Sequence, residues 1–321
     1  MDLTKTSDSP LGLRPDAYQY LRLGARPSEG TRAHRPPLGV YNISISRVLD
    51  AMREQLALLL GVVRSGRIPT AGDNLDWVDP ILKAHVEVLH AVQAHVDDCE
   101  TILKGALCEK NPWNSAPGRR FRTLTTEYRE RVDGIVNHIK HGYGRVRPFA
   151  FYTPAECFLG YYVEGVDREG AVGPEPTVHK RGRGAFSFAR DVRLHFVWLY
   201  GLSWALAEGL SAAGATACSE GGDPGDDSRY SRMAEEIEKV APVFYPDELA
   251  QPVPKVHVER EKNRVSLHVG YVDDATARSV PRSHQMRIAI RWQGDGISRS
   301  YRLPYPFREG RGNSGVLRKR S

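Results

Sequence analysis

Cysteine is scarce in this sequence, and the few cysteines lie far apart. They are Cys99, Cys108, Cys157 and Cys218, and no two of them form a Cys-x-x-Cys pair. None has the Cys/His spacing of a zinc finger either. The sequence therefore excludes a disulfide scaffold and predicts reduced thiols in a cytoplasmic protein.

Long hydrophobic runs are also missing. The most apolar stretch, residues 196–210, is shorter than a bilayer requires and contains Glu208, so it predicts a buried core helix. The first residues lack the apolar core of an export signal. We therefore expect neither a contact with the membrane nor secretion.

Glycine-rich nucleotide loops and metal motifs are absent as well. The glycine runs at 170–173 and 182–184 do not lie between a strand and a helix, and no Gly-Lys-Ser/Thr occurs. Glu87 and His90 match the Glu-x-x-His of di-iron bundles, but there is no second copy. His85, His90 and His95 step by five residues and so fan around one helix. We expect His85 at the edge of the core, the other two histidines in solvent, and neither a metal nor a cofactor.

Apolar residues at helical and then strand spacing predict an α+β protein. A mainly helical bundle carries a β-hairpin insertion and is followed by a small antiparallel β module. Helices are expected from Ser44 or Ser46 to 63, then over 80–107, 117–141, 187–212 with Ser187 as N-cap, and 229–241. The expected parts are an irregular arm (1–40), the bundle (41–242) with its insertion at about 146–186, the β module (254–307) and a basic flexible tail (308–321).

The net positive charge of the sequence lies in its C-terminal part, which includes the β module. Residues 255–321 contain 15 Lys and Arg against 6 Asp and Glu, a net charge of +9, which leaves −3 of the total +6 for residues 1–254. Strand-like alternation around turns at 262–263 and 294–296 predicts two hairpins in one sheet. The same alternation places Arg287 and Arg291 together on an exposed face, where they could contact nucleic acid or an acidic partner.

The densest set of catalytically capable side chains lies at residues 131–148. Arg131 and His138 are seven residues apart, so they project from nearly the same face of a helix. The neighbouring polar residues are Asn137, Lys140 and His141, and after the glycines that end the helix come Arg145 and Arg147. This set predicts a phosphate contact; the alternative is that His138, Lys140 and His141 only interact with the helix dipole.

The Arg-x6-His pattern and the adjoining Asn137-x-x-Lys140-His141 resemble the HEPN superfamily of helical bundles, over about residues 42–212. Many members of that family act in toxin–antitoxin and antiphage systems. The resemblance implies a metal-independent ribonuclease that works at a dimer interface. His138 would be its general acid or base, and Arg131 would stabilise the phosphorane. The sequence departs from the family at Val132, where a polar residue is usual, and His141 is an alternative to His138.

Two functions follow from these patterns. The first is a defence or toxin-type ribonuclease, in which Arg131, His138 and His141 are catalytic. Its substrate-binding residues would be Asn137, Lys140, Arg145, Arg147, Arg287 and Arg291. The second is a non-catalytic scaffold or interaction subunit of a defence-type complex, which uses the basic C-terminal sheet to bind nucleic acid or a partner protein. In either case a homodimer or larger assembly is expected.

Overall fold

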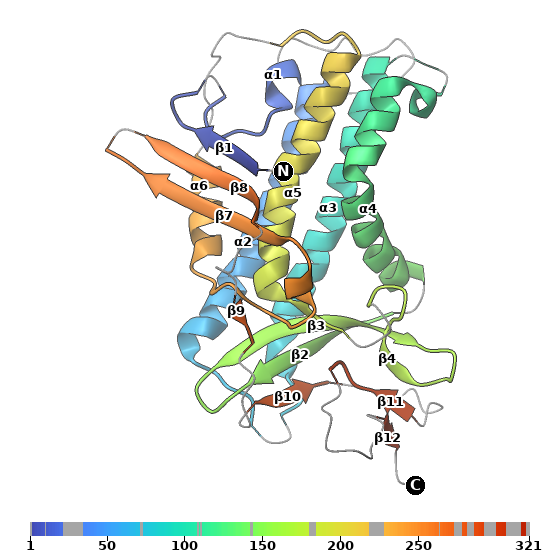
Figure 1. The fold of residues 1–321 in the computed structure, drawn as a ribbon, viewed down its shortest axis with the longest axis vertical. Coiled ribbons are helices and arrows are strands. Elements are labelled where there is room, and N and C mark those ends of the chain that lie inside the picture. The colour runs from blue at the N-terminus through green and yellow to red at the C-terminus, as the bar shows by residue number, and fades with distance from the viewer. Residues whose placement is uncertain are drawn as a thin grey trace.

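The fold is seen in a computed structural model of the chain (Figure 1). The structure describes residues 2–9, 11–21, 35–70, 73–107, 109, 111–141, 144–179, 184–217, 228–262, 264–272, 278–280, 286–291, 300–305 and 316–318. The expected turn at 294–296 lies outside these residues, as does most of the expected tail. Within the described residues, helices and several sheets occur together, which confirms the α+β class.

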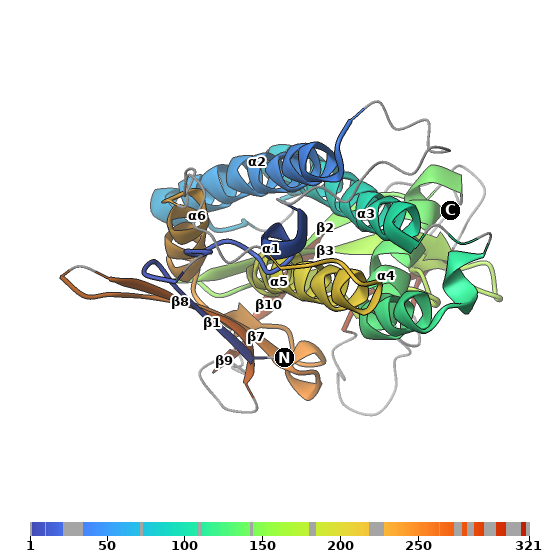
Figure 2. The ribbon, with the colours of Figure 1, turned by 90° about the horizontal axis from the view of Figure 1, so that it is seen from above.

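Four long helices run side by side and form the body of the molecule (Figures 1 and 2). They are α2 (Pro37–Ser65), α3 (Asp79–Leu107), α4 (Ala116–His141) and α5 (Phe188–Ala212). The last three match the expected ranges within one residue. Helix α5 is buried on nearly all sides, as its apolarity predicted, and Ser187 is its N-cap, with Oγ accepting a hydrogen bond from the Arg190 N–H.

Helix α2 begins earlier than expected. Pro37 occupies its first turn, where the missing N–H of proline costs nothing. Tyr41 is fully buried and extends the apolar stripe of Ile45 and Val48 by one turn. Ser44 is not a cap; it lies inside the helix and its hydroxyl contacts His95 Nδ1 at 2.8 Å.

The expectation that residues 1–40 form an irregular arm is wrong for two segments. Strand β1 (Asp2–Thr6) pairs antiparallel with β8 (Val265–Val272), and the short α1 (Tyr18–Leu21) packs into the core. The Ala17 N–H donates to Ser203 Oγ of α5 at 2.8 Å. Local sequence could not reveal this strand, because its only pairing partner in the described part of the chain lies near the other end of the sequence.

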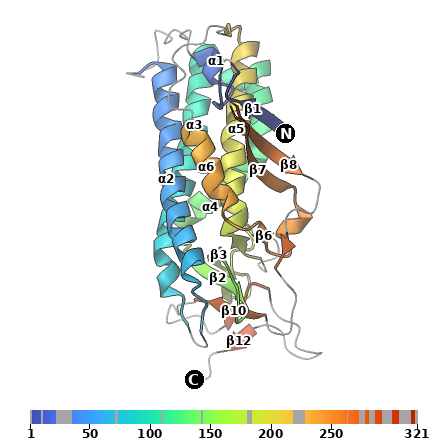
Figure 3. The same ribbon diagram turned by 90° about the vertical axis from the view of Figure 1, so that its left-hand side faces the viewer.

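The β insertion is confirmed. Strands β2 (Val146–Tyr152) and β3 (Cys157–Val166) form an antiparallel hairpin, and β4 (Val172–Pro174) and β5 (Phe186–Ser187) both pair with β3. This sheet lies across one end of the bundle, as Figures 1 and 3 show. It lies against the start of α3, the end of α4 and the start of α5.

The expectation that residues 254–307 form a separate antiparallel module is wrong. Its first hairpin exists as β7 (Val253–Arg260) and β8, but that pair is joined by β1. The later strand β10 (Arg287–Ile290) instead pairs with β2. Strand β11 (Ser300–Arg302) pairs with β4, and with β12 (Val316–Arg318), which falls in the expected flexible tail. The physical reason is that Ile288 and Ile290 pack against the aromatic cluster of β2, and this packing outweighs local hairpin geometry.

Among the described residues, the remaining elements are α6 (Ser228–Glu238), the parallel pair β6 (Val243–Phe244) and β9 (Arg278–Ser279), and the single-turn helices η1 (Asp76–Val78), η2 (Pro112–Asn114) and η4 (Glu248–Ala250). One hydrophobic cluster runs from Leu13 through the bundle to Ala289. Among the described helices, none is both long and apolar enough to cross a membrane.

Candidate functional site

The second half of α4 carries the predicted motif and faces both α5 and the sheet. Arg131 and His138 project toward this common side, but each is held by a carboxylate from another element. His179 lies between them, close enough that both charges depress its pKa, although burial is the largest cause of its fall to about 3. Arg131 and His138 therefore lie on a shared face of α4, and this face is packed against other parts of the protein.

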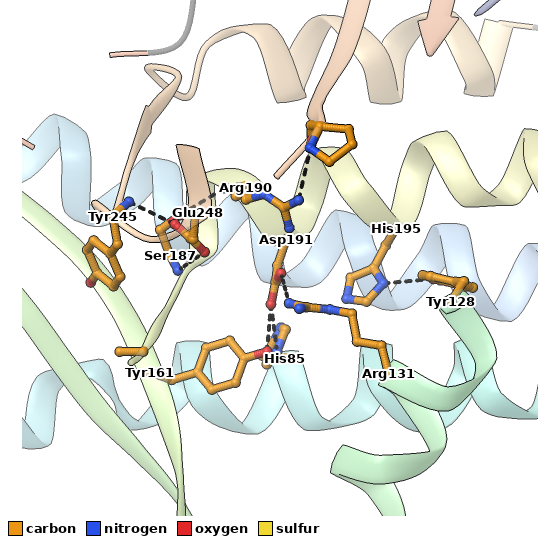
Figure 4. Close-up of polar contacts among 12 residues, drawn as sticks. His85, Tyr128, Arg131, Tyr161, Ser187, Arg190, Asp191, His195, Tyr245 and Glu248 are labelled. Atoms are coloured by element: carbon orange, nitrogen blue, oxygen red, sulfur yellow. Dashed lines mark hydrogen bonds and ion pairs between the residues drawn. The ribbon is translucent and has the colours of Figure 1, made fainter. Parts of the chain in front are cut away.

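Arg131 belongs to a buried polar network (Figure 4). Its Nη2 donates to Asp191 Oδ1 at 2.7 Å, and its guanidinium lies 4.1 Å from the centre of the Phe186 ring. Asp191 is 1% exposed, so this ion pair compensates a charge that water cannot reach. Tyr161 also donates to Asp191, at 2.5 Å.

The charge state of Asp191 follows from these partners. Burial raises the pKa of its carboxyl, but Arg131, the two nearby histidines and the Tyr161 hydroxyl outweigh burial and hold it at about 2. Those histidines, His85 and His195, are themselves kept neutral, because burial lowers their pKa values to about 3 and about 4. Asp191 and Arg131 are thus the charged pair at the centre of the network.

A second buried carboxyl lies beside this network. Glu248 accepts hydrogen bonds from the backbone and hydroxyl of Ser187 at 2.8 and 2.5 Å, and from the Tyr245 N–H at 2.8 Å. Burial raises its pKa to about 8, against the lowering effect of these donors. Glu248 therefore fastens the start of α5 to the segment that precedes η4.

His138 is engaged with the sheet. Its Nε2 donates to the Glu164 carbonyl at 3.0 Å and lies 3.7 Å from Glu175 Oε2. The ring fills the space beside Gly144, where a Cβ would lie 2.1 Å from His138 Cδ2. Because Nε2 carries the proton donated to a carbonyl, this nitrogen is not placed to take a proton from a substrate hydroxyl.

The other predicted residues divide into exposed and buried groups. Asn137, Lys140 and His141 are exposed at the end of α4, where Lys140 Nζ donates to Gln93 Oε1 at 2.9 Å. Arg147 lies in β2 rather than in an exit loop, is 6% exposed, and binds Glu164 through two hydrogen bonds of 2.7 and 3.2 Å. Its guanidinium is therefore used in a structural ion pair with Glu164.

Arg287 and Arg291 do not form the exposed pair that was expected. Arg287 is exposed, but Ala289 on the same side is 7% exposed and packs into the main core. Arg291 Nη1 donates to Asp76 at 2.7 Å and to Asp79 at 2.9 Å. The alternation of polar and apolar residues predicts which side chains share a face of a strand. It does not show whether another part of the protein covers that face, and this is why the arginines were expected to be exposed.

An open cleft of about 420 Å³ lies where α3, α4 and the sheet meet. Two of the predicted substrate-binding residues, Arg145 and Arg291, line it together, and Lys83 of α3 joins them. Its other lining residues are Asp79, Leu82, Val86, Glu87, Ile139, Gly144 and Val146. The cleft is thus a mixed surface with three cations, two carboxylates and an apolar floor.

Sequence reasoning missed the most tightly clustered chemical groups. His85 is completely buried beside Asp191 and His195 rather than at the edge of the core, and His95 is buried rather than solvated. Asp191 and His195 are four residues apart on α5, a spacing that places two side chains on one helix face and could have drawn attention to them. Lys83 carried no comparable signal.

The comparisons with known proteins give no relative. No family model, no curated protein and no solved structure matches the chain.

Proposed function

We propose that this protein binds RNA in the cleft between α3, α4 and the sheet, as a non-catalytic interaction subunit. The observation that carries the proposal is the convergence of Lys83, Arg145 and Arg291 on one open cleft. This is the second of the two functions expected from the sequence, with a different binding surface. The cleft replaces the basic C-terminal sheet, which does not exist as a separate unit.

The charges of the cleft suit a phosphate chain that passes along it. Lys83 and Arg145 are exposed and carry the charge offered to a phosphate. Arg291 lines the cleft as well, but Asp76 and Asp79 already compensate its charge. Lys140 and His141 are exposed just beyond Ile139, which lines the cleft, and extend the polar track. Leu82, Val86 and Ile139 offer an apolar surface on which a base can lie.

The state of the Arg131/His138 pair favours binding over cleavage. The Arg131 charge is used to compensate buried Asp191, and moving it onto a phosphorane would leave that carboxylate alone in the core. His138 Nε2 is bonded to a backbone carbonyl. The defence-type role, the ribonuclease activity and a homodimer rest on the HEPN resemblance and on no contact described above.

Binding to a labelled, unstructured single-stranded RNA tests the proposal, measured by fluorescence anisotropy over a range of salt concentrations. We expect Lys83→Ala with Arg145→Ala to weaken binding about tenfold and to reduce the salt slope by about 0.7 for each lost phosphate contact. The matched control removes the same charge from exposed Arg53 and Arg64 of α2. Equal loss in both double variants would reject the cleft as the binding site.

The same RNA, incubated with the protein in EDTA, decides between the two functions. Intact RNA in the presence of tight binding supports the interaction subunit. Cleavage by the wild type that disappears in both Arg131→Ala and His138→Ala would replace our proposal with the ribonuclease. No binding at low salt would remove both.

A further inference from the structure

Three potential metal ligands meet in the core of the bundle. His85 comes from α3, and Asp191 and His195 come from α5; one ligand atom of each lies within 4.8 Å of the other two. All three residues are at most 1% exposed. His85 Nε2 lies 3.9 Å from Asp191 Oδ2, too far for a hydrogen bond.

The histidine nitrogens that point inward have no partner. His85 Nε2 and His195 Nε2 are both buried without a hydrogen bond, which is unusual for polar atoms in a core. Their other ring nitrogens are engaged: His195 Nδ1 contacts the Tyr128 hydroxyl at 2.8 Å, and His85 Nδ1 contacts the Gln55 amide at 3.0 Å. An imidazole held at one nitrogen by an outer partner, with the other left open, is the usual state of a metal-binding histidine.

The Gln55 side chain strengthens this reading. Its Nε2 faces His85 Nδ1, while its Oε1 is buried without a partner. Exchanging the amide oxygen and nitrogen gives Oε1 a donor in His85 Nδ1–H, and this fixes the lone pair on His85 Nε2. One tautomer then satisfies the outer contacts and leaves Nε2 free to bind a cation.

We propose that His85, Asp191 and His195 bind one divalent transition-metal ion, zinc first, which ties α3 to α5 inside the bundle. Two imidazoles and one carboxylate are ligands that zinc accepts. Complete burial and the link between two helices indicate a structural ion. The proposal is independent of RNA binding at the cleft.

The geometry allows the ion. Arg131 contacts Asp191 through Oδ1, so Oδ2, which accepts from the Tyr161 hydroxyl, is the carboxylate oxygen available to the ion. A water molecule would be the fourth ligand, as in zinc sites with three protein ligands. Ligands of a tetrahedral zinc ion lie about 3.3 Å from one another, given metal–ligand distances near 2.0 Å. The three groups therefore need to close by up to about 1.5 Å.

Metal analysis of an untagged protein tests the proposal. The protein is stripped with a chelator, incubated with Zn²⁺ or Co²⁺, freed of excess metal and analysed by mass spectrometry of the elements. We expect about one equivalent of bound metal in the wild type, a visible Co²⁺ absorption typical of four-coordination, and a rise in melting temperature with Zn²⁺. His85→Gln and His195→Gln should each lose the metal and the rise.

His95→Gln is the matched control. His95 is also fully buried on α3 but lies outside the three-residue group, so its variant should keep one equivalent. Loss of metal in this variant as well, or a folded wild type that binds no metal and shows no thermal shift, would overturn the proposal. If the ligand variants fail to fold by circular dichroism, the Co²⁺ spectrum and thermal shift of the wild type decide the question.

Discussion

At the scale of single residues, Gly144 determines how the end of α4 meets the sheet. The ring of His138 occupies the place of a side chain at this position, and the Gly144 N–H donates to the His138 carbonyl at 3.2 Å. Gly144 also lines the cleft. Because the side chain of Gly144 is a single hydrogen, its backbone can contact the His138 ring and also line the open cleft.

Gly144→Ala should destabilise the protein by about 1–3 kcal/mol, because its Cβ would displace the His138 ring and break the bond to Glu164. Gly134→Ala in the middle of α4 is the control. A Cβ there meets nothing within 4 Å, and the change should stabilise the helix by up to about 1 kcal/mol. Urea unfolding of both variants measures the difference. Similar effects of the two substitutions would contradict this role of Gly144.

How far the site could be predicted varies from residue to residue. Arg145 and Arg291 were expected to bind substrate and do line one cleft, although Arg145 precedes β2 and Arg291 follows β10. Arg131 was expected to be catalytic and Arg147 to bind substrate, but they pair with Asp191 and Glu164. The sequence shows which residues are charged. Which carboxylate pairs with each arginine depends on contacts between segments that are distant in the sequence.

At the scale of elements, the start of α5 is held both by an N-cap and by a buried carboxyl group. Ser187 Oγ accepts from the Arg190 N–H and donates to Glu248, whose carboxyl also binds the Ser187 N–H. The residue thus caps the helix and anchors it to the segment before η4. Since Asp191 and His195 lie in the first two turns, this anchor also positions the three-residue metal-ligand group.

Ser187→Ala should cost about 1–2 kcal/mol, because it removes the cap and leaves one Glu248 oxygen with fewer donors. Ser211→Ala, at the exposed far end of the same helix, should change stability by less than about 0.5 kcal/mol. Thermal unfolding followed by circular dichroism checks both values. An equal shift for the two variants would show that the hydroxyl of Ser187 contributes nothing.

Helices and strands differed in how well they could be predicted. The bounds of α3, α4 and α5 follow from a local period and from caps, and the structure has them nearly as expected. The strands β1, β10 and β11 were either missed or assigned to the wrong sheet. Their partners are set by which apolar surface covers them, as Ile288 against the β2 aromatics illustrates, and this information is spread over the whole sequence.

At the scale of the whole molecule, one core spans the parts that were expected to be separate domains. It contains residues from the N-terminal segment, all four long helices, the β7–β8 hairpin and β10. Two of its buried histidines have no carboxylate in hydrogen-bond contact: His95 lies against Ser44 and Cys99, and His179 Nε2 accepts from the Val163 N–H at 2.9 Å. Both side chains are thus built into the fold as neutral groups.

The pH dependence of stability follows from these histidines. Burial lowers the pKa of His95 to about 4 and that of His179 to about 3, whereas both are near 6.5 in the unfolded chain. Between those values only the unfolded state takes up the protons, so the stabilisation contributed by these two neutral histidines is complete above pH 6.5 and falls as the pH drops toward 4. We expect a loss on the order of 1 kcal/mol per pH unit for each histidine.

Urea unfolding at several pH values from 7 to 4.5 measures this slope. His95→Gln should make it shallower by one proton relative to the wild type. A slope that is the same in both proteins would show that His95 is not a neutral buried group in the native state.

The pairing of β1 with β8 has a consequence for how the chain is made. Thr4 and His268 contact each other across 264 positions of sequence, so β1 leaves the ribosome long before the strand it pairs with. At 5–20 residues per second this delay is on the order of tens of seconds. Throughout that time β1 lacks its β8 partner, and it can join the sheet only after β8 has been made.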